Sequence, residues 1–278
     1  MFGNGHMLFG TKTTDILQLQ KAKPRKVCSR VLDTDDKKNY ADVMYFSDQH
    51  IGSVHCDFDF LRKQRDACLK KQIYVILGGD LIEGSTRFSI GAGLYEQNLS
   101  PHDQLLGLIS FLKPLADNQL IISICMGNHE ERFKKTVGID ITSILGYIFD
   151  APYLGYGGMN YLKVGKQNYI SYFEHGSGTA RTLSGKMKKV IDASKNIDQF
   201  DVFAWGHTHE LFSWYEYKQK YNKRFKKMEM VKKFYLLTGG YLNYNFSYAD
   251  AYSIPPVKIG SPILRFYGDE NKIEVLEI

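Results

Sequence analysis

Apolar and polar positions alternate along the chain in a pattern that predicts strands and helices in turn. Short apolar runs rich in β-branched and aromatic residues each predict a buried strand. In the first half of the chain they cover residues 43–46, 73–77 and 120–126. Apolar residues at helical spacing lie between these runs, in residues 57–71 and 100–112, and Ser100-Pro101 predicts the start of the second helix as a cap followed by a first-turn proline. The first half therefore predicts parallel βαβ units, in which helices connect neighbouring strands.

Hairpins dominate the pattern of the second half. After a helix expected over residues 139–149, the runs 161–164 and 168–173 flank Gly165-Lys166, which predicts a tight hairpin. Residues 202–205 predict one more buried strand. Residues 211–221 and 228–238 predict a long hairpin with a tip rich in lysine and arginine.

The ends of the chain have weaker patterns. Residues 1–40 are mixed, with a short possible helix over residues 14–20, and we expect an N-terminal arm or edge strand there. The tail, residues 263–278, is expected to add edge strands. Residues 41–278 then form a single domain that includes the basic hairpin at about 211–238, because 278 residues with 44% hydrophobic content can bury a full core.

Composition narrows the class of protein only slightly. The formal net charge of +6 is compatible with a polyanionic partner if the excess clusters on one face, but it does not establish one. The four cysteines have neither zinc-knuckle spacing nor the density of a disulfide scaffold, which favours a reducing, cytoplasmic location. No stretch of about 18 uncharged apolar residues predicts a membrane span.

The candidate chemistry lies directly after the apolar runs. Five polar blocks follow one another: Asp48-Gln49-His50, Gly78-Gly79-Asp80, Gly127-Asn128-His129-Glu130, Glu174-His175-Gly176 and Gly206-His207-Thr208-His209. Oxygen and imidazole ligands delivered at the ends of consecutive strands are what a binuclear metal centre needs. Each block alone is common turn chemistry, whereas the ordered series of five is specific.

This series, in this order, resembles the calcineurin-like metallophosphoesterase superfamily, and in particular its prokaryotic and phage-encoded members related to repair exonucleases. The resemblance implies an α/β fold, the four-layer metallophosphoesterase sandwich, in which two mixed β-sheets are flanked by helices. It also implies that the metals lie in the loops beyond the carboxyl ends of the strands.

The resemblance further implies a division of the metal ligands. The first metal would be held by Asp48, His50 and His209, the second by Asn128, His175 and His207, and Asp80 would bridge them. Carboxylate, amide and imidazole ligands together suit borderline divalent ions. We therefore expect two divalent metal ions, with manganese favoured over iron, zinc or nickel.

Two further residues have implied catalytic roles. His129 follows a ligand directly and resembles the general acid that protonates the leaving alkoxide, the alternative being a hydrogen-bonded histidine beside the ligands. Glu83 lies where an acid would orient this histidine, and it could equally be a solvated loop charge. Arg132 is a candidate either for phosphate contact or for bracing Glu130 or Glu131.

The substrate is open on the sequence alone. Basic residues in residues 181–195 and 218–233, the latter interleaved with aromatics, fit nucleic-acid binding. The alternative is a solvated hairpin whose aromatics pack inward and whose lysines protect an edge strand.

Two departures from the family's phosphoprotein phosphatases bear on the substrate: Gly84 and Met126 stand where those enzymes carry arginines. We expect a phosphodiesterase or nuclease acting on DNA or RNA, with no membrane partner. The alternatives are a phosphomonoesterase on a nucleotide or phosphoprotein, and a non-catalytic nucleic-acid-binding subunit.

Overall fold

The computed structural model of the protein describes residues 26–34, 39–86, 89, 95–178, 180–244 and 255–276. The expected helix over residues 14–20 lies outside these residues. So does part of residues 83–99, where glycines and small polar residues predict a loop. The helices are α2 (Phe58–Lys71), α3 (Pro101–Asp117), α4 (Asn128–Val137), α5 (Ile141–Ile148) and α6 (Leu183–Ser194). The strands are β1 (Val27–Leu32), β2 (Tyr40–Phe46), β3 (Tyr74–Leu77), β4 (Ile121–Ile124), β5 (Gly157–Val164), β6 (Gln167–Glu174), β7 (Val202–Trp205), β8 (Leu211–Asn222), β9 (Lys227–Thr238), β10 (Ile263–Tyr267) and β11 (Ile273–Leu276).

The strands form two mixed sheets. One has five strands in the order β11-β10-β2-β3-β4, and the other has six in the order β1-β5-β6-β7-β9-β8. In the first sheet β2, β3 and β4 are parallel, as expected for the two βαβ units. In the second, β5 and β6 form one antiparallel hairpin and β8 and β9 another. The expected division between parallel units and hairpins is confirmed.

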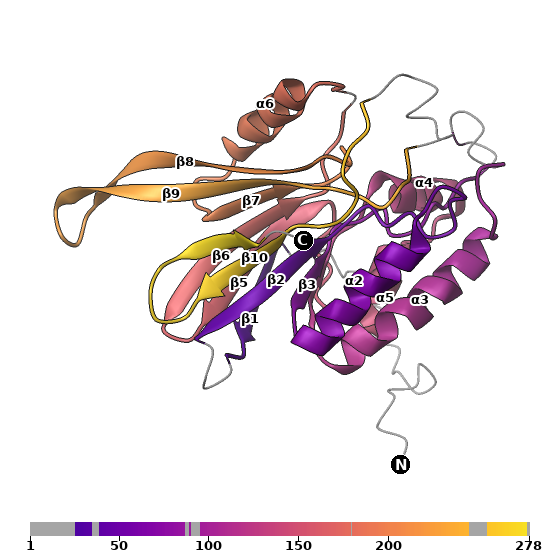
Figure 1. Cartoon of the computed structure of the whole chain (residues 1–278), viewed down its shortest axis with the longest axis horizontal. Helices are drawn as coiled ribbons and strands as arrows, with labels where there is room; N and C mark the ends of the chain where they lie inside the picture. The colour runs from indigo at the N-terminus through magenta and orange to yellow at the C-terminus, as the bar shows by residue number, and fades with distance from the viewer. Residues whose placement is uncertain are drawn as a thin grey trace, which may run out of the picture.

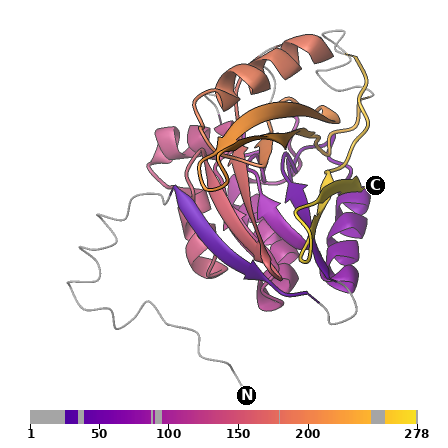
Figure 2. The same cartoon turned by 90° about the vertical axis from the view of Figure 1, so that its left-hand side faces the viewer.

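The two sheets pack face to face with helices outside (Figures 1 and 2). Successive side chains of β2 point to opposite faces of its sheet, so both faces are covered. Tyr45 points inward, where its hydroxyl lies 2.7 Å from Ser171 Oγ of β6 in the other sheet, while Phe46 points outward onto Phe111 of α3. On the far side, Val190 of α6 packs onto the outer face of the six-stranded sheet. The expected α/β sandwich of four layers is confirmed.

Helix α3 begins as its sequence predicts. The side chain of Ser100 accepts a hydrogen bond from the backbone N–H of Asp103, and Pro101 occupies the first turn. Both features favour a helix start because they satisfy or remove backbone donors that have no partner within the helix. This cap fixes where the chain leaves the loop beside the candidate site.

The structure departs from expectation at two helices and at the tail. Helix α4 and helix α6 were not expected, since the first begins inside a block interpreted as ligands and the second lies in a segment interpreted only as basic. The tail does not contribute edge strands alone: β11 lies at an edge, but β10 lies between β11 and β2. In the described part of residues 1–40, β1 pairs only with β5 and lies at the edge of the six-stranded sheet.

Three of the four cysteines belong to the hydrophobic core. Cys28, Cys68 and Cys125 are buried, and Cys56 is partly buried. Among the residues that the structure describes, each helix is too short or too polar to cross a membrane.

Candidate metal centre

The polar blocks meet at one edge of the sandwich because they follow parallel strands. Asp48, Asp80 and Asn128 come after β2, β3 and β4 of one sheet, and His175 and His207 come after β6 and β7 of the other. The carboxyl ends of parallel strands point the same way, so each strand delivers its ligand to the same region. The fold therefore places all of these side chains at the same edge of the sandwich.

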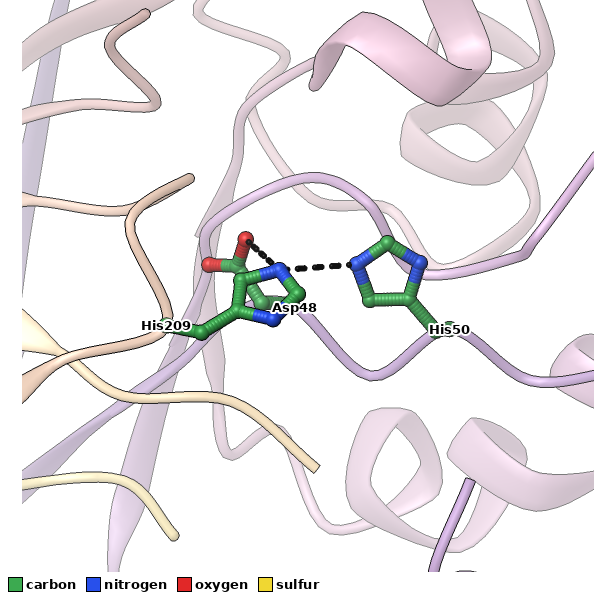
Figure 3. Close-up of side chains that lie close together, drawn as sticks. All are labelled: Asp48, His50 and His209. Carbon is green, nitrogen blue, oxygen red and sulfur yellow. Dashed lines mark hydrogen bonds and ion pairs between the residues drawn. The ribbon is translucent and has the colours of Figure 1, made fainter. Parts of the chain in front are cut away.

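One group of ligand atoms consists of Asp48, His50 and His209, which Figure 3 shows converging from two loops. His50 Nε2 lies 3.1 Å from His209 Nε2, and His209 Nε2 lies 3.4 Å from Asp48 Oδ1. The three ligand atoms lie within 4.8 Å of one another. Two imidazole nitrogens and a carboxylate oxygen at this spacing surround a point that a cation can occupy.

A second group consists of Asp80, His175 and His207, joined by Asn128. His175 Nε2 lies 3.2 Å from Asp80 Oδ2. Asn128 Oδ1 lies 3.2 Å from His175 Nε2 and 2.7 Å from His207 Nδ1. The amide oxygen, the carboxylate and both imidazoles thus face one position, beside the first group.

Asp80 lies between the two groups. Its Oδ1 accepts a hydrogen bond from the backbone N–H of His129 at 2.8 Å. Its Oδ2 lies 3.9 Å from His50 Nε2 in the first group and 3.2 Å from His175 Nε2 in the second. One oxygen is therefore held by the backbone, and the other is directed to both candidate cation positions, as a bridging ligand requires.

Three of the histidines are oriented by acceptors outside the centre. His50 Nδ1 donates to Glu83 Oε2 at 3.0 Å, and His175 Nδ1 donates to the carbonyl of Gly78 at 2.8 Å. His207 Nε2 lies 3.2 Å from the carbonyl of Gly178. A ring that donates through its outer nitrogen presents a lone pair from the other, which is the arrangement of metal-bound histidines. The residues present therefore fit a pair of divalent metal ions.

Backbone conformation also distinguishes the site. Of the non-glycine residues with positive φ, five are expected ligands: Asp48, His50, Asp80, His207 and His209, at 53°, 49°, 48°, 63° and 51°. This conformation is disfavoured for residues with a Cβ and concentrates at functional sites. The fold holds these side chains in place against a local conformational preference.

Charge is concentrated at Asp80 and His175. Burial alone would raise the pKa of Asp80, but His175 and His129 outweigh burial and hold this pKa well below its usual value. Burial would likewise lower the pKa of His175, and the carboxylates of Asp80 and Asp48 instead raise it to about 10. In this pocket the carboxylates strongly favour a positive charge next to them, which a divalent ion supplies.

Glu83 and His129 lie beside His50 of the first group and contact each other. His129 Nδ1 donates to the backbone carbonyl of Glu83 at 2.5 Å, and its Nε2 lies 3.9 Å from Asp80 Oδ2. The Glu83 carboxylate makes its shorter contact with His50 Nδ1, since Oε1 lies 3.5 Å from His129 Nδ1. Burial opposes ionisation of Glu83, but His50 lowers its pKa to about 2. Glu83 thus orients the metal-facing His50 with its side chain and His129 with its main chain.

Glu130 has a role that the sequence patterns did not reveal. Its buried carboxylate accepts backbone N–H groups from four residues, at 2.7 to 3.3 Å: Asp80, Leu81, Ile82 and Gly127. This one side chain joins the loop after β3 to the loop after β4. A glutamate at the third position of a helix is a known sequence signal for capping, but the signal says nothing of a second loop.

Arg132 is the other open candidate of this helix. Its guanidinium donates to Ser89 Oγ at 3.0 Å, and among the contacts of the described residues it braces neither Glu130 nor Glu131. The carboxylate of Glu131 pairs instead with Lys135 at 2.8 Å.

Comparison with known proteins finds solved structures at low sequence identity and low TM-score. No family model and no curated protein matches the chain. A predicted phosphoesterase from Streptococcus pneumoniae is 12% identical with a TM-score of 0.38, over 85% of this chain and 89% of that one. Vps29 from Entamoeba histolytica, solved in complex with Zn²⁺, is 14% identical with a TM-score of 0.36, over 85% of this chain and 98% of that one. The resemblance to the calcineurin-like metallophosphoesterases therefore rests on the motif series and on the arrangement of the ligands in space.

Proposed function

We propose that this protein is a binuclear-metal-dependent phosphoester hydrolase, and that its substrate is a phosphodiester of nucleic acid. The observation that carries the proposal is the position of Asp80 Oδ2 between two separate groups of nitrogen and oxygen ligands. Two cations sharing one carboxylate are a recurrent arrangement for hydrolysis of phosphoesters. We propose manganese as the metal, because the mixed carboxylate, amide and imidazole set suits borderline ions.

The residues of the chain then have distinct tasks. When bound, two divalent ions supply an activated water and neutralise charge on the phosphoryl oxygens. His129 directs Nε2 toward the centre because its Nδ1 donates to the carbonyl of Glu83. A protonated Nε2 can therefore donate its proton to the leaving oxygen, the role of a general acid. Glu83, by holding His50 and His129 together, keeps this acid at a fixed distance from the ligands.

A comparison of esters tests the proposal. Purified protein with added manganese is incubated with bis-nitrophenyl phosphate, with nitrophenyl phosphate and with end-labelled oligonucleotides. We expect metal-dependent turnover of the diester and cleavage of the oligonucleotides, both abolished by Asp80→Asn. Turnover of the monoester alone would overturn the diesterase assignment in favour of a phosphomonoesterase. Absence of turnover on all three, with two metals bound, would favour a non-catalytic binding subunit.

A further inference from the structure

The β8–β9 hairpin extends well beyond the rest of the molecule, as Figure 1 shows on its left side. Near its root the hairpin is part of the six-stranded sheet, and its inner face packs into the sandwich: Phe234 and Leu236 belong to the core between the sheets. Further out, the five-stranded sheet ends. A groove of about 720 Å³ lies there, lined by Tyr215, Lys232 and Phe234 together with Ile273–Val275.

Register shows which side chains continue the inner face beyond this groove. Tyr215 pairs with Phe234, Tyr217 with Lys232, Gln219 with Met230 and Tyr221 with Met228. Side chains of directly paired residues share one face of a sheet. The inner face therefore stays aromatic and apolar after the opposing sheet has ended.

The opposite face of the same segment is charged. Its pairs are Glu216 with Lys233, Lys218 with Val231, Lys220 with Glu229 and Asn222 with Lys227. We call the aromatic face, made of Tyr215, Tyr217, Gln219, Tyr221, Met228, Met230 and Lys232, the arm face.

The arm face is open to solvent. Tyr215, Tyr217 and Tyr221 are 53%, 59% and 53% exposed, and Met228 and Met230 are 57% and 60% exposed. A hairpin that serves only to protect an edge strand would bury its aromatics, as one interpretation of the sequence expected; these are not buried. A contiguous exposed apolar surface of this kind marks a site of interaction.

Charge identifies the kind of partner. Residues 211–238 contain eight lysines and arginines and two glutamates, a net charge of +6 that equals the formal net charge of the whole chain. On the arm face itself, Lys232 Nζ lies 3.8 Å from the ring centre of Tyr215 and 4.5 Å from that of Phe234. The tip adds Arg224 and Phe225, which is 61% exposed. The partner must offer flat apolar surfaces and negative charge together.

We propose that the arm face binds single-stranded nucleic acid, with bases stacked on Tyr217, Tyr221 and their neighbours and phosphates neutralised by Lys232 and the basic tip. Stacking needs base faces that a duplex does not expose, so the single-stranded form is the one that fits. The inference rests on the proposed function in taking nucleic acid as the substrate, and it adds the surface that holds the polymer outside the metal centre.

The position of the arm suits this task. Strand β8 begins at Leu211, two residues after the ligand His209. At about 3.4 Å per residue, Tyr215 lies roughly 20 Å along the chain from that ligand and Arg224 at the tip roughly 50 Å. A second copy of the chain fits the arm face less well, because two hairpins of net charge +6 repel each other.

Binding measured without catalysis tests the inference. Full-length protein in EDTA is titrated into fluorescent oligothymidine of about 20 nucleotides, longer than the 4–16 nucleotides that such surfaces cover. We expect Tyr217→Ala with Tyr221→Ala to weaken binding at least about tenfold, given the value of base stacking measured by alanine substitution. The pair Tyr217→Phe with Tyr221→Phe should retain the affinity, because the rings remain. Lys232→Gln should flatten the dependence of log affinity on log salt by roughly 0.7.

Controls separate the possible failures. Tyr147 of α5 is 52% exposed and far from the arm in sequence, so Tyr147→Ala should bind as the unaltered protein does. An equal loss in Tyr147→Ala, or unchanged binding in the Tyr217 and Tyr221 double variant, overturns the inference. So does a dimer that the double alanine variant abolishes, or preferential binding to vesicles of anionic lipid. Diester turnover without oligonucleotide binding would overturn the inference and leave the hydrolase standing, whereas binding without turnover would support the arm and reject the hydrolase.

Discussion

Replacing Glu130 by glutamine is the sharpest test of how the centre is assembled. The carboxylate accepts N–H groups of Leu81 and Ile82 on Oε1, and those of Asp80 and Gly127 on Oε2. Glutamine retains one oxygen and replaces the other by an NH₂ group. In either orientation of the amide, two buried backbone donors then face another donor and have no acceptor.

The expected loss of stability follows from that count. A buried donor left without a partner costs about 1–3 kcal/mol, so two cost about 2–6 kcal/mol. For a chain of 278 residues the unfolding entropy is about 0.6 kcal/mol/K, which converts this loss to a fall in Tm of about 3–10 °C. Because the same bonds fix the loop that carries Asp80, metal affinity should also fall about 10- to 100-fold, as it does when groups behind a ligand are removed.

The neighbouring glutamate supplies a matched control. Glu131 lies one position further on the same helix, and its partners are Lys135 and the hydroxyl of Tyr156. Glu131→Gln keeps an oxygen acceptor, and loss of a partly exposed ion pair should cost less than about 1 kcal/mol. Scanning calorimetry and manganese titration of both variants give the result. If Glu130→Gln melts and binds metal as Glu131→Gln does, the carboxylate does not join the two loops.

Other variants probe separate parts of the centre. His129→Asn should lower kcat for a diester about a hundredfold or more with both metals still bound by elemental analysis, and unchanged turnover would reject the acid role. Removing metal with EDTA should lower Tm, and manganese at 100 times its Kd should restore about 2.7 kcal/mol, or roughly 5 °C, for each site that it fills; a Tm indifferent to metal would contradict the proposed ligand set. Gly79→Ala should cost about 2–4 kcal/mol in urea unfolding, because φ is +84° and a Cβ would lie 2.3 Å from Gly127 N, whereas Gly107→Ala, with open space in α3, should stabilise by about 0.5–1 kcal/mol.

The elements that sequence could predict are those with one dominant signal. Residues 202–205 form a buried apolar run and become β7 without a shift in either boundary. The start of α3 was predicted from Ser100 and Pro101, whose capping chemistry is local. The proposed ligands follow the same logic, because a polar residue directly after a buried strand emerges at the end of the sheet. Local signals therefore predict which side chains the fold brings together.

Helix α6 was missed because its buried face is not apolar throughout. Lys186 is 4% exposed and pairs with Glu210 at 2.9 Å, while Val190 continues the same face into the core. From sequence alone such a lysine is interpreted as solvent-exposed, because its partner lies 24 residues away along the chain. Two more of the segment's lysines, Lys188 and Lys195, pair with Asp192 on the helix itself. Much of the positive charge of residues 181–195 is thus neutralised, whereas the hairpin, despite its two ion pairs, keeps a net charge of +6.

The order of residues in the block Gly127-Asn128-His129-Glu130 follows from the start of a helix and from contacts with a distant loop. Helix α4 begins at Asn128, so Asn128 and His129 occupy its first turn and Glu130 its third position. Glu130 Oε2 reaches back to Gly127 N, the usual capping contact, yet Asp80 N lies at the same oxygen and two more donors at the other. With four backbone donors, the carboxylate has no lone pair to spare for a metal. In this block the amide oxygen of Asn128 is therefore the group that faces the candidate cation position, at 3.2 Å from His175 Nε2 and 2.7 Å from His207 Nδ1.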